Sequence, residues 1–377
     1  MKKNKLVFVC NVDWYFSLHW LDRAISALDE FEVHVILSST DDKYKEEIIN
    51  SGLIYHSISL SRSSVSIKNE IVSFYQIYKV IKQIEPNLLH SVTIKPNVYV
   101  GLISRFLNIP LVSSFAGLGM LSTSTDIKYR IYFDILKRLI KIRSKTKGYL
   151  ALFESQDDLD RLVNDSVVTS SKAVRVYGAG VDIDRYIYHP PSEVGPKIIL
   201  FAARLLKDKG LSELIQAKNM LLQKGYKLEL HVAGILDEGS RTGYSKAEIE
   251  KLGERGDIVW LGKRDDIPNL IQRSTLVALP TTYGEGVPRI LIEAASCGRP
   301  IVTTSLGGCK DICIDNLNGN TCRPGDISSL ANAIETIISN DDVAYSYGLE
   351  GRNLVLDRFT NDSIICQNNE FYRNLLS

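Results

Sequence analysis

The sequence predicts an α/β protein of two domains, each built on a doubly wound parallel sheet. Its 377 residues are more than one hydrophobic core usually organises, which favours two domains. Short apolar runs without polar alternation, typical of parallel strands buried on both faces, alternate with segments of helical periodicity. A segment rich in Gly, Pro, Tyr and Asp at 178–196 interrupts this alternation and indicates a linker.

The first domain is expected at 1–177. Its apolar runs predict strands at 5–10, 31–37, 53–60, 88–92, 111–115, 149–153 and 173–176. The helical patterns between them include one that ends at 28 and others at 42–51, 66–84, 98–107, 126–147 and 156–163.

The second domain is expected at 197–360. Strands are predicted at 198–203, 228–233, 258–261, 275–280 and 300–304, and helices at 211–223, 246–252, 267–273, from 288 onward, 326–339 and 343–359. A last helix at 361–377 carries a terminal apolar cluster, so we expect it to pack back on the first domain. These units predict two Rossmann-like domains with a cleft between them, a frequent place for ligands.

Composition and charge exclude several classes of protein. With 45% hydrophobic and 24% charged residues the chain should fold fully, and a net charge of +1 gives no general attraction to nucleic acid. The six cysteines show no paired metal-ligand spacing, so we expect reduced thiols. The first apolar run is too short for a signal peptide and no run of about 18 apolar residues occurs, so we expect a cytoplasmic protein.

Two glutamates mark the candidate site. Glu285 lies between Gly284 and Gly286 after a predicted strand, and Glu293 follows eight positions later, more than two turns into the expected helix. Ligands of open parallel sheets bind beyond the carboxyl ends of the strands. Each carboxylate could therefore hold a different hydroxyl of one long ligand, although glutamates in a turn or on a helix are commonly just exposed.

A basic loop is expected at the same sheet edge. Arg204 and Lys209 follow the first strand of the second domain. Arg binds phosphate through two prongs and Lys as a compact charge, so the two suit a diphosphate, and the helix start after Pro288 offers free N–H groups to the same anion. The alternative is a solvated basic loop.

These residues resemble the signature of family 4 retaining glycosyltransferases, whose GT-B fold places two Rossmann-like domains across a cleft. Glu285-Gly286-Val287-Pro288 followed by Glu293 is similar to the family's paired-glutamate motif. The loop from Arg204 to Gly210 resembles its diphosphate-binding loop, and the segments 178–182 and 358–360 also match. The resemblance covers the whole chain.

The resemblance implies a role for each matching residue. Arg204 and Lys209 would bind the diphosphate of a UDP-sugar, Glu293 the ribose and Glu285 the transferred sugar, and Arg204, Lys209 and Glu285 would act in catalysis. Further donor contacts are implied for Gly262, Lys263 and Arg264 at the nucleobase and for Gly286, Val287, Pro288, Arg289 and Ile290. No cofactor or metal is implied, because the two cations would stabilise the leaving diphosphate.

Three first-domain motifs are similar to a branch that extends undecaprenyl-diphosphate-linked sugars in bacterial O-antigen, lipopolysaccharide, capsule and glycan assembly. The branch implies that a lipid-diphosphate-linked sugar acceptor contacts Asn11, Asp13, His19, Lys95, Gly117 and Gly119. Many family members carry a histidine where this chain has Ala116-Gly117-Leu118-Gly119, so a backbone carbonyl is expected there. For His19, an ordinary paired helix histidine is an equal alternative.

The helix at 126–147 predicts contact with the inner face of the cytoplasmic membrane. Its expected apolar face holds Tyr132, Ile135, Leu136, Leu139 and Ile142, and its basic face Arg130, Lys137, Arg138, Lys141 and Lys145. Such a pattern suits an interfacial helix at anionic lipid. The alternative is a helix packed on the sheet with a solvated basic face.

The sequence therefore predicts a retaining glycosyltransferase, a hexosyl or N-acetylhexosaminyl transferase, that acts on a lipid-diphosphate-linked saccharide. N-acetylgalactosamine in an α1,3 linkage is the first expectation from the branch. Two other functions stay open: a UDP-N-acetylglucosamine 2-epimerase-like isomerase, and a non-catalytic nucleotide-sugar-binding assembly protein. The isomerase should have a catalytic carboxylate–histidine set in the first domain, and we find none in the sequence. The presence together of the four charged residues Arg204, Lys209, Glu285 and Glu293 argues against a non-catalytic protein.

Overall fold

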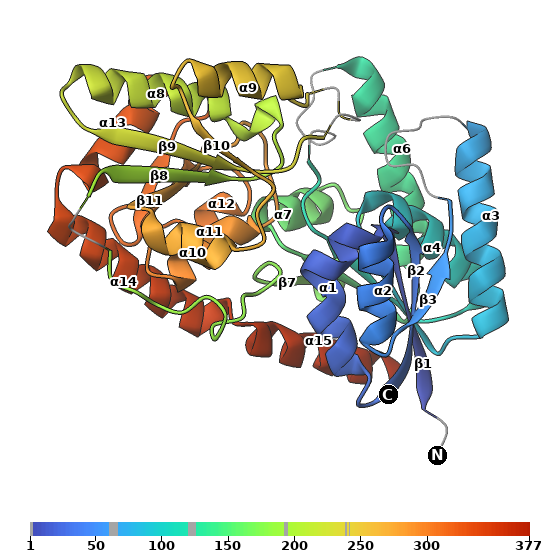
Figure 1. Ribbon diagram of the computed structural model, residues 1–377. Helices are drawn as coiled ribbons and strands as arrows, with labels where there is room; N and C mark the ends of the chain where they lie inside the picture. Colours follow the sequence, from blue (N-terminus) through green and yellow to red (C-terminus); the bar gives the residue numbers. More distant parts are fainter. Residues whose placement is uncertain (1–2, 60–66, 120–125, 192–194, 238–239, 241) are drawn as a thin grey trace. The chain divides into compact units, whose positions relative to one another are not determined.

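The chain forms two compact units, each a parallel α/β sheet with helices on both faces (Figure 1). The computed structural model describes residues 3–59, 67–119, 126–191, 195–237, 240 and 242–377. The first unit comprises Met1–Ala179 and Asp362–Ser377, and the second comprises Gly180–Asn361. The predicted α/β class with two doubly wound parallel sheets is confirmed.

The first sheet has seven parallel strands in the order β3-β2-β1-β4-β5-β6-β7. The order turns back between β1 and β4, which makes this the switch point of the sheet. The strands are β1 Asn4–Val12, β2 Phe31–Ser38, β3 Ile54–Ser57, β4 Leu88–Val92, β5 Leu111–Phe115, β6 Tyr149–Phe153 and β7 Ala173–Arg175.

The apolar strands of the first sheet are covered on both faces. Along β1, Leu6 and Phe8 belong to one hydrophobic cluster, whereas Val7 and Val9 belong to another, as the alternation of side chains in a strand requires. The helices of this unit are α1 Asp13–Ala27, α2 Asp42–Asn50, α3 Ile67–Ile84, α4 Ile94–Leu107, α6 Ile127–Ser144, α7 Gln156–Asn164 and α15 Asn361–Leu376, with a 3₁₀ turn η1 at Ser170–Lys172.

The last helix, α15, packs in the first unit beside α1 (Figure 1). Tyr372 is fully buried among residues of β1 and α1, and its hydroxyl lies 2.7 Å from His90 Nδ1. Arg373 pairs with Glu30 at 2.6 Å just after α1. A helix that is far away in sequence thus completes one face of the first sheet.

The second sheet has six parallel strands in the order β10-β9-β8-β11-β12-β13. The strands are β8 Lys197–Ala202, β9 Leu228–Ala233, β10 Val259–Gly262, β11 Leu276–Leu279, β12 Ile301–Thr304 and β13 Gly319–Cys322. The helices are η2 Lys207–Lys209, α8 Leu211–Gln223, α9 Lys246–Glu254, α10 Ile267–Arg273, α11 Arg289–Ser296, α12 Cys309–Ile312, α13 Ile327–Ile338 and α14 Asp341–Arg358. The sequence did not predict β13, because Gly319-Asn320-Thr321-Cys322 contains no apolar run.

Part of the segment predicted as a linker packs into the second unit. Val181 forms a bridge with Thr360, and Tyr186 is buried. The Tyr186 carbonyl accepts hydrogen bonds from Ser296 Oγ at 2.8 Å and from Arg352 at 3.1 Å. The segment around Val181 and Tyr186 is therefore held by α11, by α14 and by Thr360 rather than spanning freely.

The faces predicted for the helix at 126–147 need correction. In α6 the buried apolar side chains are Phe133, Leu136 and Ile140, whereas Ile135 and Ile142, which were expected on the same apolar face as Leu136, are exposed. The buried face also holds Arg143, which donates to Ser104 Oγ at 2.7 Å and to the Gly148 carbonyl at 2.6 Å. These bonds fix the rotation of the helix. Within the described residues, no helix is long and apolar enough to cross a bilayer.

Candidate active site

The carboxyl edge of the second sheet gathers the residues predicted to bind the donor. Arg204 follows β8, Gly262 ends β10, and Glu285 lies in the turn between β11 and α11. All strands of this sheet are parallel, so their carboxyl ends share one edge. The α11 helix begins where predicted, directly after Pro288, whose extended backbone precedes the first turn.

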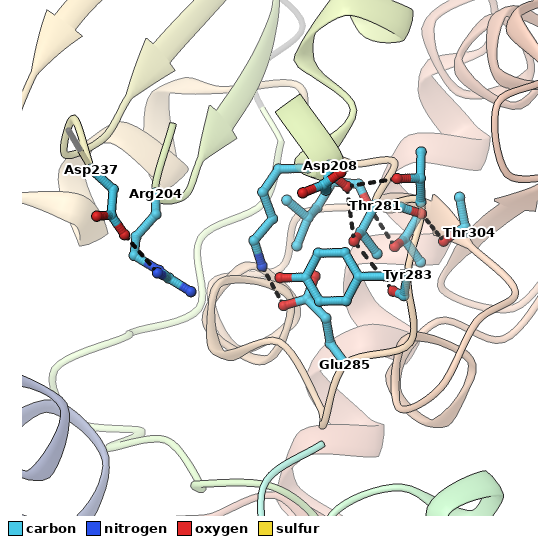
Figure 2. A network of polar contacts seen from close by, with 11 residues as sticks. Arg204, Asp208, Asp237, Thr281, Tyr283, Glu285 and Thr304 are labelled. Carbon is cyan, nitrogen blue, oxygen red and sulfur yellow. Dashed lines mark hydrogen bonds and ion pairs between the residues drawn. The ribbon is translucent and has the colours of Figure 1, made fainter. Parts of the chain in front are cut away.

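Lys209 and Glu285 form a buried ion pair at this edge (Figure 2). The Lys209 ammonium also lies 5.2 Å from the centre of the Tyr283 ring. Burial lowers the pKa of Lys209, but the charge of Glu285 and contacts with Tyr283 outweigh burial, so this pKa is raised overall. Lys209 is therefore a fixed positive charge in a largely dry position.

Only one of the two carboxylate oxygens of Glu285 takes part in this ion pair. Glu285 Oε2 contacts Lys209, whereas Oε1 is enclosed and has no hydrogen-bond partner among the described residues. A buried carboxylate oxygen without a donor is costly. The arrangement therefore suits a ligand that brings a hydroxyl or N–H group to Oε1.

Close backbone packing holds the two loops together. Gly210, which follows Lys209, has φ +83°, and an added Cβ would lie 2.1 Å from the Pro280 carbonyl oxygen. On the other side of the site, the Gly308 amide donates to the Glu285 carbonyl at 2.9 Å, and a Cβ on Gly308 would meet the Gly286 backbone at 2.5 Å. The Gly307-Gly308 pair after β12 was missed by the sequence interpretation, although two glycines three and four residues after the end of a predicted strand could have indicated it.

Threonines tie η2 to the ends of β11 and β12. The Asp208 carbonyl accepts hydrogen bonds from the Thr281 hydroxyl at 3.3 Å and the Thr282 amide at 2.9 Å (Figure 2). The Thr304 hydroxyl donates to the Thr281 carbonyl at 2.7 Å. The loop that carries Lys209 is thus positioned by the loop that carries Glu285.

Glu293 is satisfied from within the protein. It is buried as the fifth residue of α11, just over one turn into the helix, which corrects the predicted depth of more than two turns. Its carboxylate accepts a 2.7 Å bond from Arg289 Nε, one turn earlier. Tyr186 lies against the same carboxylate: burial first, and then the charge of Glu293, raises the pKa of this tyrosine. A role of Glu293 in binding ribose stays a prediction.

Arg204 lies apart from the Lys209–Glu285 pair in Figure 2. Its Nη1 contacts Asp237 Oδ2 at 2.9 Å, a carboxylate after β9 that the sequence interpretation missed because nothing in its local pattern marks it. Lys263 and Arg264 are exposed after β10, and Arg264 holds Asp266 through two bonds of 2.7 and 2.6 Å. The structure brings these residues to the same edge of the second sheet.

The residues predicted to contact an acceptor lie at or near the carboxyl edge of the first sheet. Asn11 is in β1, Gly117 and Gly119 follow β5, and Lys95 lies in the first turn of α4, which begins four residues earlier than predicted. The Lys95 ammonium pairs with Glu70 of α3 at 2.8 Å. His19, within α1, packs against Tyr15 with ring centres 4.4 Å apart. Their acceptor roles stay predictions.

Asp13 has a different place from the one expected. It is fully buried at the start of α1, where its carboxylate accepts 2.8 Å bonds from the Thr40 and Trp14 amides and a further bond from the Thr40 hydroxyl. The structure therefore gives Asp13 the role of fastening the loop after β2 to the end of β1. Its role as an acceptor contact stays a prediction.

The structure shows no metal centre in the parts that it describes. Nowhere in those ranges do three His, Cys, Asp or Glu side chains lie close enough to hold an ion. The expectation that no metal or cofactor takes part stays a prediction. Apart from the exposed Cys366, the cysteines are buried, and burial raises the pKa of the thiols of Cys297, Cys309 and Cys322 to about 12.

Comparison with known protein families accounts for both units. Residues 183–353 match the model of the glycosyl transferases group 1, and residues 5–151 match that of the glycosyl transferase 4-like proteins. The chain belongs to the group 1 glycosyltransferases. The predicted family 4 retaining enzyme with a GT-B fold is thereby confirmed. The isomerase and the non-catalytic binding protein, left open by the sequence, are set aside.

Two relatives of this glycosyltransferase align with it over most of their length at low sequence identity. It is 24% identical over 336 residues, 86% of each chain, to the N,N'-diacetylbacillosaminyl-diphospho-undecaprenol alpha-1,3-N-acetylgalactosaminyltransferase of Campylobacter jejuni. It is 22% identical to the capsular polysaccharide biosynthesis glycosyltransferase CapM of Staphylococcus aureus, over 92% of this chain and 90% of CapM. Among solved structures, Anabaena HepE in complex with UDP and glucose has a TM-score of 0.81 and 22% identity, covering 98% and 100% of the two chains.

Proposed function

We propose that this glycosyltransferase moves a sugar from a UDP-sugar to an undecaprenyl-diphosphate-linked saccharide, with retention, in the assembly of a bacterial surface polysaccharide such as O-antigen lipopolysaccharide or capsule. The observation that carries the proposal is the Lys209–Glu285 pair with its unpartnered Oε1 at the sheet edge. The undecaprenol-linked substrate named for the Campylobacter relative supports the acceptor, and its N-acetylgalactosamine and α1,3 linkage are our first choice for the product.

The chemistry follows from the charges. Lys209 and Arg204 neutralise the diphosphate as the bond from the anomeric carbon to the phosphate oxygen breaks and its electron pair leaves with the UDP. The acceptor hydroxyl attacks the same face of the sugar, and its proton passes to the departing diphosphate oxygen. Glu285 Oε1 accepts a hydrogen bond from a hydroxyl of the transferred sugar, and Glu293 with Arg289 binds the ribose. The enzyme thus acts by positioning and by stabilising charge.

A donor panel tests this function. UDP-N-acetylgalactosamine, UDP-galactose, UDP-glucose and UDP-N-acetylglucosamine are each incubated with a synthetic lipid-diphosphate GalNAc or GlcNAc acceptor, and product linkage is analysed. We expect an α-linked product with one donor, lost in Glu285→Gln but kept in Glu229→Gln, a control at an exposed carboxylate of β9. Transfer by Glu285→Gln at the wild-type rate would contradict the site, and absence of transfer with every donor would contradict the function.

The proposed location is the inner face of the cytoplasmic membrane, with α6 as the contact. Four isoleucines of α6, each between 47% and 62% exposed, lie in one stripe at spacings of four, four and seven residues: Ile127, Ile131, Ile135 and Ile142. Arg138 lies within this stripe, and Arg130 and Lys145 are exposed near it. The buried face of α6 points the other way, and the side chains of this stripe are about half exposed in the described structure. Exposed apolar side chains flanked by cations suit an anionic lipid surface.

Vesicle co-sedimentation tests this contact. Ile131→Gln with Ile135→Gln should lose binding to vesicles of anionic phospholipid, and Arg130→Glu with Arg138→Glu should lose it most at low salt. Lys137 is left unchanged because it pairs with Asp134 and Asp165. Leu349→Gln with Leu356→Gln, exposed apolar positions on α14, serves as control. Equal binding by all four proteins would rule out α6 as the contact.

A further inference from the structure

The carboxyl edge of the first sheet contains polar atoms that the protein itself leaves unused. Asn11 at the end of β1 and Thr93 directly after β4 lie on neighbouring strands at the switch point. Asn11 Oδ1 and Thr93 Oγ1 are enclosed, and neither has a hydrogen-bond partner within the described ranges. Buried polar groups are normally paired, so an unpaired cluster at a sheet edge points to a missing ligand.

Thr93 also has an unusual backbone. Its φ of 74° and ψ of 164° lie in a region that a β-branched residue rarely adopts. Strain of this kind is found most often at ligand-binding and active sites. The neighbouring bonds that hold it are from the Thr93 amide to the Ser114 carbonyl at 3.2 Å and from the Asn97 amide to the Thr93 carbonyl at 3.0 Å.

Glu154 is the most costly of the unused groups. It follows β6, and its amide donates to the Phe115 carbonyl at 3.1 Å, which fixes its backbone beside the glycine loop after β5. The residue is only 8% exposed, yet in the described part of the chain no hydrogen bond reaches its carboxylate. An ionised carboxylate in that position loses most of its hydration, and no hydrogen-bond donor within the described residues replaces it.

The charges around Glu154 compensate its burial only in part, because Arg23 and Arg175 lower its pKa less than burial raises it. Arg23 and Tyr15 of α1, Arg175 of β7 and Asp158 of α7 are its titratable neighbours. Arg23 is buried, lies 4.2 Å from the Trp20 ring and donates to the Gly178 carbonyl at 2.7 Å. Its Nε and Nη1 have no hydrogen-bond partner in the described structure, so Arg23 attracts Glu154 through its charge without donating a hydrogen bond to the carboxylate. Asp158 instead holds the Leu118 amide at 2.9 Å.

We propose that Glu154 binds a sugar hydroxyl of the acceptor at the first sheet. This inference rests on the proposed function and deepens it, because it assigns the saccharide end of the acceptor to a residue that the sequence motifs do not mark. An ionised carboxylate is an acceptor only and suits the hydroxyl groups of a sugar. Strand spacing places Thr93 about 10 Å from Glu154, two strands away, so the two contact different parts of an extended acceptor.

Titration supports the same role. Burial raises the pKa of Glu154 to about 7, opposed by Arg23 and Arg175 and assisted by Asp158. The carboxylate therefore gains its charge near neutral pH. The hydroxyl-binding form is fully present only above that value, so acceptor binding should strengthen as the pH rises from 6 to 8.

The test compares wild type with Glu154→Gln, which keeps the shape of the side chain, by measuring kcat and both KM values from pH 6 to 9. We expect the acceptor KM to rise at least tenfold, the donor KM and the affinity for UDP to stay within twofold, and the rise of acceptor kcat/KM near pH 7 to disappear. Glu154→Asp retains the charge with a shorter reach, so it should keep the pH dependence at a raised acceptor KM.

The outcomes separate this inference from the proposed function. Transfer by wild type with an unchanged acceptor KM and pH profile in Glu154→Gln would overturn the role of Glu154 and leave the function standing. Equal increases of donor and acceptor KM would also overturn it, since they indicate a general structural effect. Absence of transfer to any lipid-diphosphate acceptor would remove the proposed function and this inference together.

Discussion

Lys209 is the residue on which the proposed donor site depends most directly. It supplies a buried positive charge, and one carboxylate oxygen of its partner Glu285 has no hydrogen-bond donor among the described residues. We expect Lys209→Met to lower kcat about 100-fold or more, because a preorganised charge at the leaving group is lost. Steady-state kinetics measure this. Lys224→Met, which breaks the exposed pair with Glu335 on the same unit, is the control and should leave kcat unchanged.

Glu154 should reduce stability at neutral pH. Its folded pKa of about 7 lies above the ordinary value of 4.5, so its favourable contribution is complete below pH 4.5 and is lost as the pH rises through 7. Glu154→Gln should therefore raise the free energy of unfolding of the first unit at pH 8 by up to about 3 kcal/mol.

Thermal melting of both proteins at pH 5 and pH 8 measures this difference. The gap between variant and wild type should be larger at pH 8. A variant that is less stable than wild type at pH 8 would show that the carboxylate has a structural partner. Together with a loss of acceptor affinity, increased stability would identify a residue kept for binding at a cost to the fold.

At the scale of residues, the sequence predicted which charged side chains matter but not what they contact. Glu285 and Lys209 were predicted at one edge, because parallel strands present their carboxyl ends together. Asp237, Tyr283 as a neighbour of Lys209, and Glu154 could not be predicted, since these contacts join loops that only the folded chain brings together. Arg289 as partner of Glu293 could have been predicted from the spacing of four residues on one helix.

Among the elements, the turn after η2 is the most restricted. Gly210 combines a φ of +83° with a contact that leaves no room for a Cβ. Gly210→Ala should destabilise the second unit by at least about 2 kcal/mol and displace Lys209. Urea denaturation measures the stability.

Gly225 provides a matched control for this substitution. It also has a left-handed backbone, with φ +93°, but nothing lies within 4 Å of an added Cβ. Gly225→Ala should cost only the backbone strain of about 1 kcal/mol. Equal losses in both variants would show that the approach to Pro280 is unimportant.

The helix α6 shows where pattern alone fails. The helix has enough apolar residues to form two apolar faces, and their helical spacing alone does not predict which face packs against the sheet. Arg143 decides the matter, because its bonds to Ser104 and Gly148 require it to be inside. Helices α8, α10 and α15, with one clear apolar face or clear end signals, were predicted to within one residue of their observed ends. The short β13 was missed because its pairing comes from β12 rather than from its own composition.

For the whole molecule, α15 is the element that closes the first unit. Tyr372 is buried and lies 2.7 Å from His90, whose other ring nitrogen lies 2.8 Å from the Ser114 hydroxyl. Tyr372→Phe should lower the free energy of unfolding by about 1–3 kcal/mol, because it leaves a buried ring nitrogen without its partner. Tyr345→Phe, exposed on α14, is the control for the loss of a hydroxyl.

Thermal melting followed by tryptophan fluorescence measures this effect, since Trp20 lies 4.8 Å from the His90 ring. Equal melting of wild type and Tyr372→Phe would show that the hydroxyl adds nothing to the fold. The two-sheet organisation was predictable from the repeated strand–helix units. That His90 and Tyr372 would meet was not, because residues 180–361 separate the two parts of the first unit.

This separation sets an order of events during synthesis. The chain leaves the first unit at Ala179 and rejoins it at Asp362. At ordinary elongation rates roughly ten seconds or more pass between these points. The nascent chain therefore lacks the part of the first unit's apolar cluster that α15 contributes, including Tyr372, while the ribosome produces the whole second unit. The first unit begins the chain, yet it is complete only when the last helix has been made.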